Sequence, residues 1–158
     1  MSLPSSVAAA AGASTLPDDP QALAELTART MYDGDAASKA LGAKVVSVAP
    51  GAASMSMTVR TDMLNGHKTC HGGFIFALAD STFAFACNSR NAATVASGCT
   101  IDFLAPAFQD DVLTATASEY SLAGRTGVYD VQVTNQDGKR IAIFRGRSYR
   151  IKGQVVAD

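Results

Sequence analysis

The chain has few charged residues, no tryptophan and only three cysteines among its 158 residues. Charged residues make up 17% and hydrophobic residues 47%, which excludes a wholly disordered chain, because disorder combines high charge with low hydrophobicity. The 13 basic and 14 acidic side chains nearly cancel, so no nucleic acid is expected as a partner. The longest apolar runs, such as 74–79, fall far short of the ~20 residues of a membrane span, so no membrane partner is expected either.

The three cysteines are odd in number and lack paired spacing, which argues against a disulfide framework. Reduced thiols predict a cytoplasmic protein, and the first basic residue, Arg29, comes too late for the charged start of a signal peptide. Residues 1–19 are rich in Ala, Ser and Pro and are expected to form a disordered tail. Residues 20–158 are expected to form one domain.

The pattern of apolar residues predicts two short helices, two strands, a long buried helix and four further strands. The segment that begins at Gly72 has almost no polar face, so we expect that helix to be buried on all sides. An antiparallel sheet wrapped around one central hydrophobic helix is the economical α+β arrangement, and the hotdog fold has this architecture. The expected helices are 20–32, 35–41 and 72–87, and the expected strands are 44–49, 54–59, 95–103, 112–120, 126–134 and 140–151.

Asp80 is the first candidate for chemistry, because it lies inside this apolar helix. A carboxylate there is costly unless it is paired, hydrated or functional. Loss of water would raise the pKa of Asp80 and suit it to act as a base. The alternative is a carboxylate that simply bonds to a neighbouring loop.

His71, Gly72 and Gly73 at the start of the same helix are the second candidate. Helix N-termini carry free backbone N–H groups and the positive end of the helix dipole, and glycines allow close approach to the backbone. These groups suit a developing oxyanion on a carbonyl. The alternative is a helix entry with glycines for packing.

The two candidates cannot act on one carbonyl within one chain. Gly72 and Asp80 are eight positions apart, which is about 12 Å along a helix. If both act, the site needs two chains with antiparallel central helices, as in a twofold dimer.

Other polar residues near the helix start have simpler interpretations. Asn65-Gly66 is a turn dipeptide, so on its own Asn65 is interpreted as a turn residue. His67, Cys70 and His71 are too few for a zinc site, and no metal is expected. Cys70 near a helix N-terminus could be a nucleophilic thiolate, but its neighbour His71 points elsewhere on most backbones, so we expect Cys70 to be a packing residue. Cys87 and Cys99 are interpreted as small core residues.

Several stretches of the sequence resemble the phenylacetate-pathway (PaaI-type) thioesterases. The stretch from Asn65 to Gly73 reads NGHKTCHGG, and Leu78-Ala79-Asp80 follows it. CTIDFL from Cys99 and GVYD from Gly127 are also similar to that group. His-Gly-Gly with an aspartate eight positions after the first glycine is specific to this branch of hotdog thioesterases. The resemblance covers about residue 23 to the C-terminus.

The resemblance implies hydrolysis of a CoA thioester, preferably of a ring-hydroxylated phenylacetic acid, without a cofactor. It also implies a homodimer of hotdog subunits that assembles as a tetramer, and by the spacing argument above the two chains of the homodimer would share each active site. Asp80 would be the nucleophile or the general base, and the Gly72 N–H would polarise the thioester carbonyl. Asn65 would help place the carbonyl or water, and His71 would lie beside the leaving thiolate. Relatives carry a Ser or Thr across from the aspartate on the following strand, and Thr100 is the nearest candidate.

Positive charge gathers in the C-terminal strands, either as a solvated face or as a rim for the phosphates of CoA. The candidate substrate-binding residues are Gly73, Arg125, Thr126 and Arg145. Two other functions stay open: a non-catalytic acyl-CoA sensor, which would not need an acid at Asp80, and an acyl-CoA hydratase of the same fold. Release of free CoA separates a thioesterase from both.

Overall fold

The computed structural model describes residues 15–157. Within that range the helices and strands follow the predicted order. They are α1 (Pro20–Gly34), α2 (Ala36–Leu41), β1 (Lys44–Ala49), β2 (Ala52–Thr58), the 3₁₀ helix η1 (Thr61–Met63), α3 (Gly72–Asn88), β3 (Ala92–Phe103), β4 (Val112–Ala123), β5 (Thr126–Thr134) and β6 (Arg140–Gln154).

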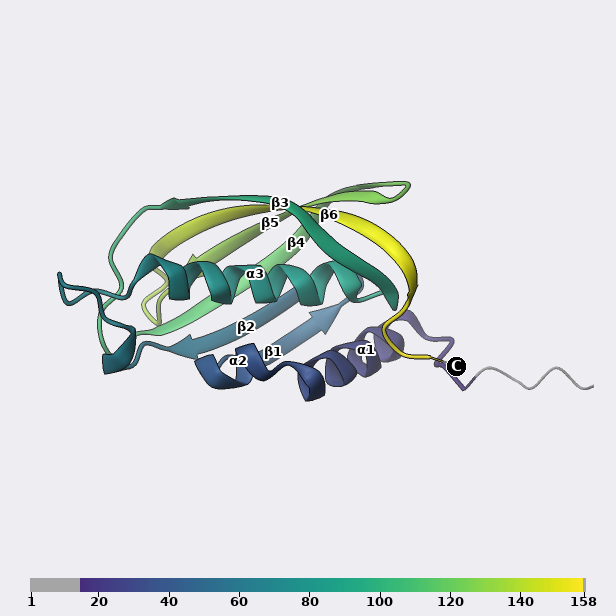
Figure 1. The fold of residues 1–158 in the computed structure, drawn as a ribbon, viewed down its shortest axis with the longest axis horizontal. Helices are drawn as coiled ribbons and strands as arrows, with labels where there is room; N and C mark the ends of the chain where they lie inside the picture. The colour runs from purple at the N-terminus through teal and green to yellow at the C-terminus, as the bar shows by residue number, and fades with distance from the viewer. Residues whose placement is uncertain (1–14, 158) are drawn as a thin grey trace, which may run out of the picture.

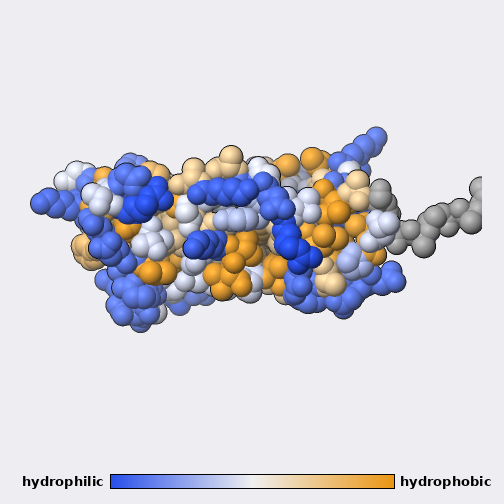
Figure 2. All heavy atoms as spheres, turned by 90° about the horizontal axis from the view of Figure 1, so that it is seen from below, coloured by the Kyte–Doolittle hydropathy of each residue, from blue (hydrophilic) through white to orange (hydrophobic). Residues whose placement is uncertain are grey.

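The strands form one antiparallel sheet in the order β1-β2-β4-β5-β6-β3. The sheet curls around α3, and α1 and α2 lie on the outside below β1 and β2 (Figure 1). Seen from that side, apolar surface lies between groups of hydrophilic side chains (Figure 2). The predicted α+β architecture is therefore confirmed, with β1 and β3 as the two edge strands.

Several strands are longer than predicted, because their backbone hydrogen bonds continue beyond the apolar residues. β3 begins three residues before its predicted start, and β4 and β6 each end three residues after their predicted ends. Pairing of the backbone does not require an apolar side chain. The polar loop 61–69 contains η1. Of the expected tail 1–19, residues 1–14 lie outside the described residues. Residues 15–19 lead into α1, whose cap Asp19 accepts the Ala22 N–H at 2.8 Å.

The core is the contact between α3 and the concave face of the sheet. Leu78, Phe83 and Phe85 of α3 are at most 1% exposed. The expectation that α3 is buried on all sides is wrong for one face. Gly73 is exposed, and Ala77, Asp80 and Ala84 keep partial exposure. They recur every three or four residues, so they share one face of the helix.

Gly146 on β6 is the tightest glycine of this contact. A Cβ added there would lie 2.8 Å from three ring carbons of Phe83, and Phe83 cannot move away, because it is itself 1% exposed. We expect Gly146→Ala to lower the free energy of unfolding by about 1–3 kcal/mol, as overpacking does in other cores.

Urea unfolding of both proteins measures this difference. Gly66→Ala is the matched control, since a Cβ at Gly66 meets nothing within 4 Å. A Gly146→Ala protein as stable as that control would contradict the packing argument.

Candidate active site

The start of α3 presents one backbone N–H that has no partner. His71 is the N-cap, and its Nδ1 accepts the Gly73 N–H at 3.0 Å. The Phe74 N–H donates to the His71 carbonyl at 3.0 Å. Among residues 15–157 the Gly72 N–H donates no hydrogen bond. A free N–H at the positive end of a helix is a donor site for a carbonyl oxygen or an oxyanion.

The loop before α3 is held by its own backbone and by Asn65. The Asn65 Oδ1 accepts the N–H groups of His67 and Thr69 at 2.9 and 3.3 Å, and its Nδ2 donates to Thr69 Oγ1 at 3.1 Å. Two longer-range bonds, from Cys70 N–H to the Ala107 carbonyl and from His71 N–H to the Met63 carbonyl, are 2.8 Å each. These bonds give Asn65 the turn role, and its catalytic role stays a prediction.

Phe103, at the end of β3, covers the Cα side of Gly72. A Cβ at Gly72 would lie 2.9 Å from the Phe103 Cζ, so any larger residue there would require the Phe103 ring to shift. Phe103 is nevertheless 53% exposed, which means that the ring has a free face beside the helix start. Sequence reasoning missed this residue, because nothing local signals that residues 72 and 103 meet.

Asp80 lies in the middle of α3, two turns after Gly72 and on its partly exposed face. Burial raises the pKa of Asp80, and a hydrogen bond from Cys99 opposes the rise. The Cys99 Sγ is 3.9 Å from the Asp80 Oδ1. A carboxylate with a raised pKa in a partly open position is suited to accept a proton or to attack a carbonyl.

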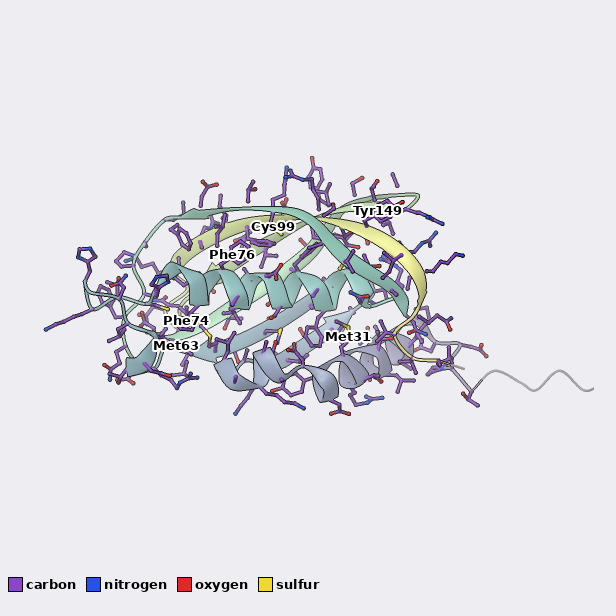
Figure 3. All side chains as sticks on the ribbon, viewed as in Figure 1. Met31, Met63, Phe74, Phe76, Cys99 and Tyr149 are labelled. Carbon is purple, nitrogen blue, oxygen red and sulfur yellow. The ribbon has the colours of Figure 1, made fainter. Side chains whose placement is uncertain are left out.

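Thr100 does not face Asp80, so this expectation is wrong for the single chain. Thr100 is exposed and pairs in register with Arg145, whereas the preceding Cys99 pairs with the buried Gly146. Side chains alternate between the two faces of a strand. Cys99 therefore faces α3, and Thr100 faces outward. Figure 3 shows Cys99 of β3 and Phe76 of α3 between the helix and the strands.

The candidate substrate-binding residues do not gather at one place. Arg145 lies on the outer face of the sheet, where it forms a salt bridge with Asp130 at 2.6 Å and stacks over Tyr120 at 5.0 Å. Arg125 and Thr126 lie at the β4–β5 turn, and the Thr126 hydroxyl donates to the Ala123 carbonyl at 3.1 Å. Gly73 is at the helix start, but its N–H is taken by His71.

An apolar pocket of about 640 Å³ opens beside the helix start. Its apolar lining comes from α2 and α3, with His71 and Arg60 as its polar members. Its lining residues are Ala37, Ala40, Leu41, Arg60, His71, Gly73, Phe74 and Ala77. Within residues 15–157 no group of three or more His, Cys, Asp or Glu side chains lies together as metal ligands would.

Comparison with known proteins assigns the family. The sequence model of the thioesterase superfamily matches residues 67–142. Acyl-coenzyme A thioesterase PaaI of Escherichia coli (strain K12) is 52% identical over 131 residues, 83% of this chain and 94% of that protein. This chain belongs to the thioesterase superfamily.

Solved structures agree with this assignment. The E. coli PaaI protein from the phenylacetic acid degradation operon is 51% identical and superposes with a TM-score of 0.85, covering 86% of this chain and 99% of that one. A hypothetical thioesterase of Streptococcus pneumoniae TIGR4, solved with coenzyme A, is 25% identical with a TM-score of 0.71, covering 80% and 96%. The hotdog fold inferred from the order of elements is thereby confirmed for this thioesterase.

Helices that could cross a membrane are not found among the described residues of this thioesterase.

Cys70, beside the helix start, is not expected to be the nucleophile of this thioesterase. It is 5% exposed, and burial raises the pKa of its thiol to about 11, whereas a nucleophilic cysteine must be a thiolate. We expect Cys70→Ser to keep thioester hydrolysis within about threefold of the original rate. A thiol-alkylating reagent that inactivates the original protein but spares Cys70→Ser would contradict this.

Proposed function

We propose that this thioesterase hydrolyses acyl-CoA thioesters, with phenylacetyl-CoA or its ring-hydroxylated forms as the preferred substrates. The observation that carries the proposal is a pair of groups on α3: the unpartnered Gly72 N–H at its start and the half-buried Asp80 carboxylate two turns later. Thioester hydrolysis needs such a pair, because charge develops on the carbonyl oxygen while a nucleophile attacks the carbonyl carbon. The relatives named as acyl-CoA thioesterases and the operon of the E. coli protein support the substrate class.

In this mechanism the Gly72 N–H donates to the thioester carbonyl oxygen. The Asp80 carboxylate either takes a proton from the attacking water or attacks the carbonyl carbon itself. The carbon–sulfur bond then breaks, and the electron pair leaves with the CoA thiolate. If Asp80 itself attacks, the product is an anhydride on its carboxylate, and water must then hydrolyse this anhydride to release the acid and restore Asp80. His71 stays the candidate residue beside that thiolate, with its Nδ1 already accepting the Gly73 N–H.

The acyl group has a suitable place beside the oxyanion donor. The pocket at the helix start has a size and an apolar lining typical of small-molecule sites. Phe74 lines it, and the half-exposed Phe103 ring offers a second aromatic surface on the other side of Gly72. An aryl ring is therefore a better fit than a polar acyl chain.

Among the basic candidates for the CoA phosphates, Arg125 is better placed than Arg145. The Asp130 carboxylate already neutralises Arg145 through two hydrogen bonds of 2.6 and 2.8 Å. Arg125 lines a hollow together with Arg150 at the far end of the sheet, where Arg90 is already paired with Glu119 at 2.6 Å. Thr126 follows Arg125 directly. Positive charge gathered there suits phosphate groups.

We propose a cytoplasmic homodimer in which each site takes groups from two chains. Gly72 and Asp80 lie about 12 Å apart along α3, so one carbonyl cannot meet both in one chain. β3 is an open edge strand of 12 residues, and its side chains Val95 and Phe103 are 46% and 53% exposed. Long apolar edges favour pairing with another strand. A tetramer of two such dimers is the assembly that the family resemblance implies.

Replacement of Asp80 tests the function directly. We expect the original protein to release free CoA from phenylacetyl-CoA and Asp80→Asn to release it at least about 10³-fold more slowly, because the amide can neither take a proton nor attack. Trapping of the freed thiol with a chromogenic disulfide measures the rate.

Binding of the CoA ester to Asp80→Asn, measured by calorimetry, is the control and should be retained. If the original protein binds acyl-CoA without releasing CoA, the sensor function replaces the thioesterase function. If Asp80→Asn hydrolyses within a few-fold of the original rate, Asp80 is not part of the mechanism.

Subunit mixing tests the shared site. We expect inactive Asp80→Asn and inactive Gly72→Pro proteins to regain activity after exchange, because one site of each mixed dimer combines an intact Gly72 N–H with an intact Asp80. At equal mixing about half of the dimers are mixed, so about a quarter of the original activity should return. Native mass spectrometry counts the mixed dimers.

The matched control for proline is Gly72→Ala, which keeps the N–H. Both substitutions add a Cβ against the Phe103 ring, while only proline removes the donor. The His71 backbone, at φ −61° and ψ 132°, is already in the conformation that precedes a proline. Mixed dimers without activity would contradict the shared site.

A further inference from the structure

Cys99 is the one side chain among residues 15–157 that hydrogen-bonds the Asp80 carboxylate. It comes from β3, nineteen positions later in the chain, and its Sγ lies 3.9 Å from the Asp80 Oδ1. Its strand partner is Gly146, which lies under the Phe83 ring and has no side chain of its own. The geometry therefore directs the thiol toward the face of α3 that carries Asp80.

We propose that Cys99 is a positioning residue for Asp80, whose thiol donates a hydrogen bond that orients the carboxylate and keeps it charged. This proposal rests on the proposed function, since it gives Cys99 its role through the catalytic Asp80. It replaces the interpretation of Cys99 as a small core residue. In this proposal the group that faces Asp80 from β3 is the Cys99 thiol, in place of the Thr100 hydroxyl that the sequence had suggested.

The thiol has the protonation state that this role needs. Burial and the neighbouring Asp80 charge both raise the pKa of Cys99, and Arg147 opposes them. Cys99 therefore stays a neutral thiol at neutral pH, which donates a hydrogen bond rather than repelling the carboxylate. The same protonation argues against Cys99 as a nucleophile.

The other titratable groups around this pair are Cys87 and Arg147. Cys87 lies on α3 with its thiol donating to the Ala84 carbonyl at 3.5 Å, and burial raises the pKa of Cys87 to about 12. Arg147 on β6 reaches over Gly98, where a Cβ would meet its guanidinium at 3.2 Å. Neither forms a hydrogen bond with Asp80, so Cys99 is the group whose loss changes the carboxylate directly.

The sign of the effect follows from two opposing causes. Burial raises the pKa of Asp80, and the Cys99 hydrogen bond lowers it. When Cys99 is removed, burial still raises the pKa of Asp80 but the hydrogen bond no longer lowers it. The Asp80 carboxylate therefore accepts its proton at a higher pH. Since the charged form is the active one, the acid limb of the pH profile of kcat/KM must move to higher pH.

The test compares Cys99→Ala, Cys99→Ser and Cys87→Ala with the original protein, using phenylacetyl-CoA hydrolysis over a range of pH. On the acid limb we expect Cys99→Ala to lower kcat/KM by about two- to tenfold. The loss should come from kcat and not from KM. On the alkaline plateau the loss should be smaller. Cys99→Ser restores a donor and should return the acid limb to the original position or below it. Cys87→Ala removes a buried thiol that does not bond Asp80, so it should leave the limb in place.

A second readout is independent of hydrolysis. Titration of ¹³C-labelled aspartate carboxyls by NMR, with the Asp80 signal assigned from Asp80→Asn, follows the charge of Asp80 itself. We expect the Asp80 midpoint to move up in Cys99→Ala and to move back in Cys99→Ser. An unchanged midpoint in Cys99→Ala, or a Cys99→Ser protein that behaves like Cys99→Ala, would overturn the proposal. Absence of CoA release by the original protein would instead overturn the proposed function, and the NMR titration would still decide the role of Cys99.

Discussion

The packing of α3 against the concave face of the sheet controls every group of the candidate site. It buries one side of the helix, including Phe83 at 1% exposure, and leaves a row of small residues with Asp80 on the other. Asp80 is nevertheless half-buried on that side, beside Cys99 of β3, and this burial raises the pKa of its carboxylate. A looser contact would hydrate the carboxylate and bring its pKa back toward an ordinary value. Core packing and the proposed catalytic chemistry are therefore linked through one helix.

The rigidity of that helix has a second consequence. A helix keeps its first N–H and a side chain two turns later at a constant separation of about 12 Å, whatever the rest of the chain does. One thioester carbonyl therefore meets an oxyanion donor and an activating carboxylate only if two helices lie side by side. The open β3 edge and the small residues on the free face of α3 are compatible with such an approach. Phe103, which lies on Gly72 and ends β3, connects the helix start to that same edge.

The phase of β3 explains why Cys99 and not Thr100 faces Asp80. The register between β3 and β6 shifts between Ala96 and Gly98, and an irregularity of this kind changes which residues point inward. From Cys99 onward the strand nevertheless alternates, because Cys99 and Ile101 are apolar whereas Thr100 and Asp102 are polar. This local pattern already indicates that Cys99 faces inward. The order of the helices and strands was predictable, because the apolar patterns of α3 and of the strands are long and distinct. The contact between the Cys99 thiol and the Asp80 carboxylate was not, because it joins two elements that are nineteen positions apart in the chain.

The sequence by itself determined what depends on neighbours along the chain. His71 as the cap, the free N–H of Gly72, the burial of α3 and the eight-residue spacing to Asp80 all follow from local backbone geometry and side-chain hydropathy. Only the tertiary structure decided which distant groups meet, because strand register sets those contacts. It paired Arg145 with Asp130 across two strands, laid Phe103 on Gly72 and brought the Cys99 thiol to Asp80.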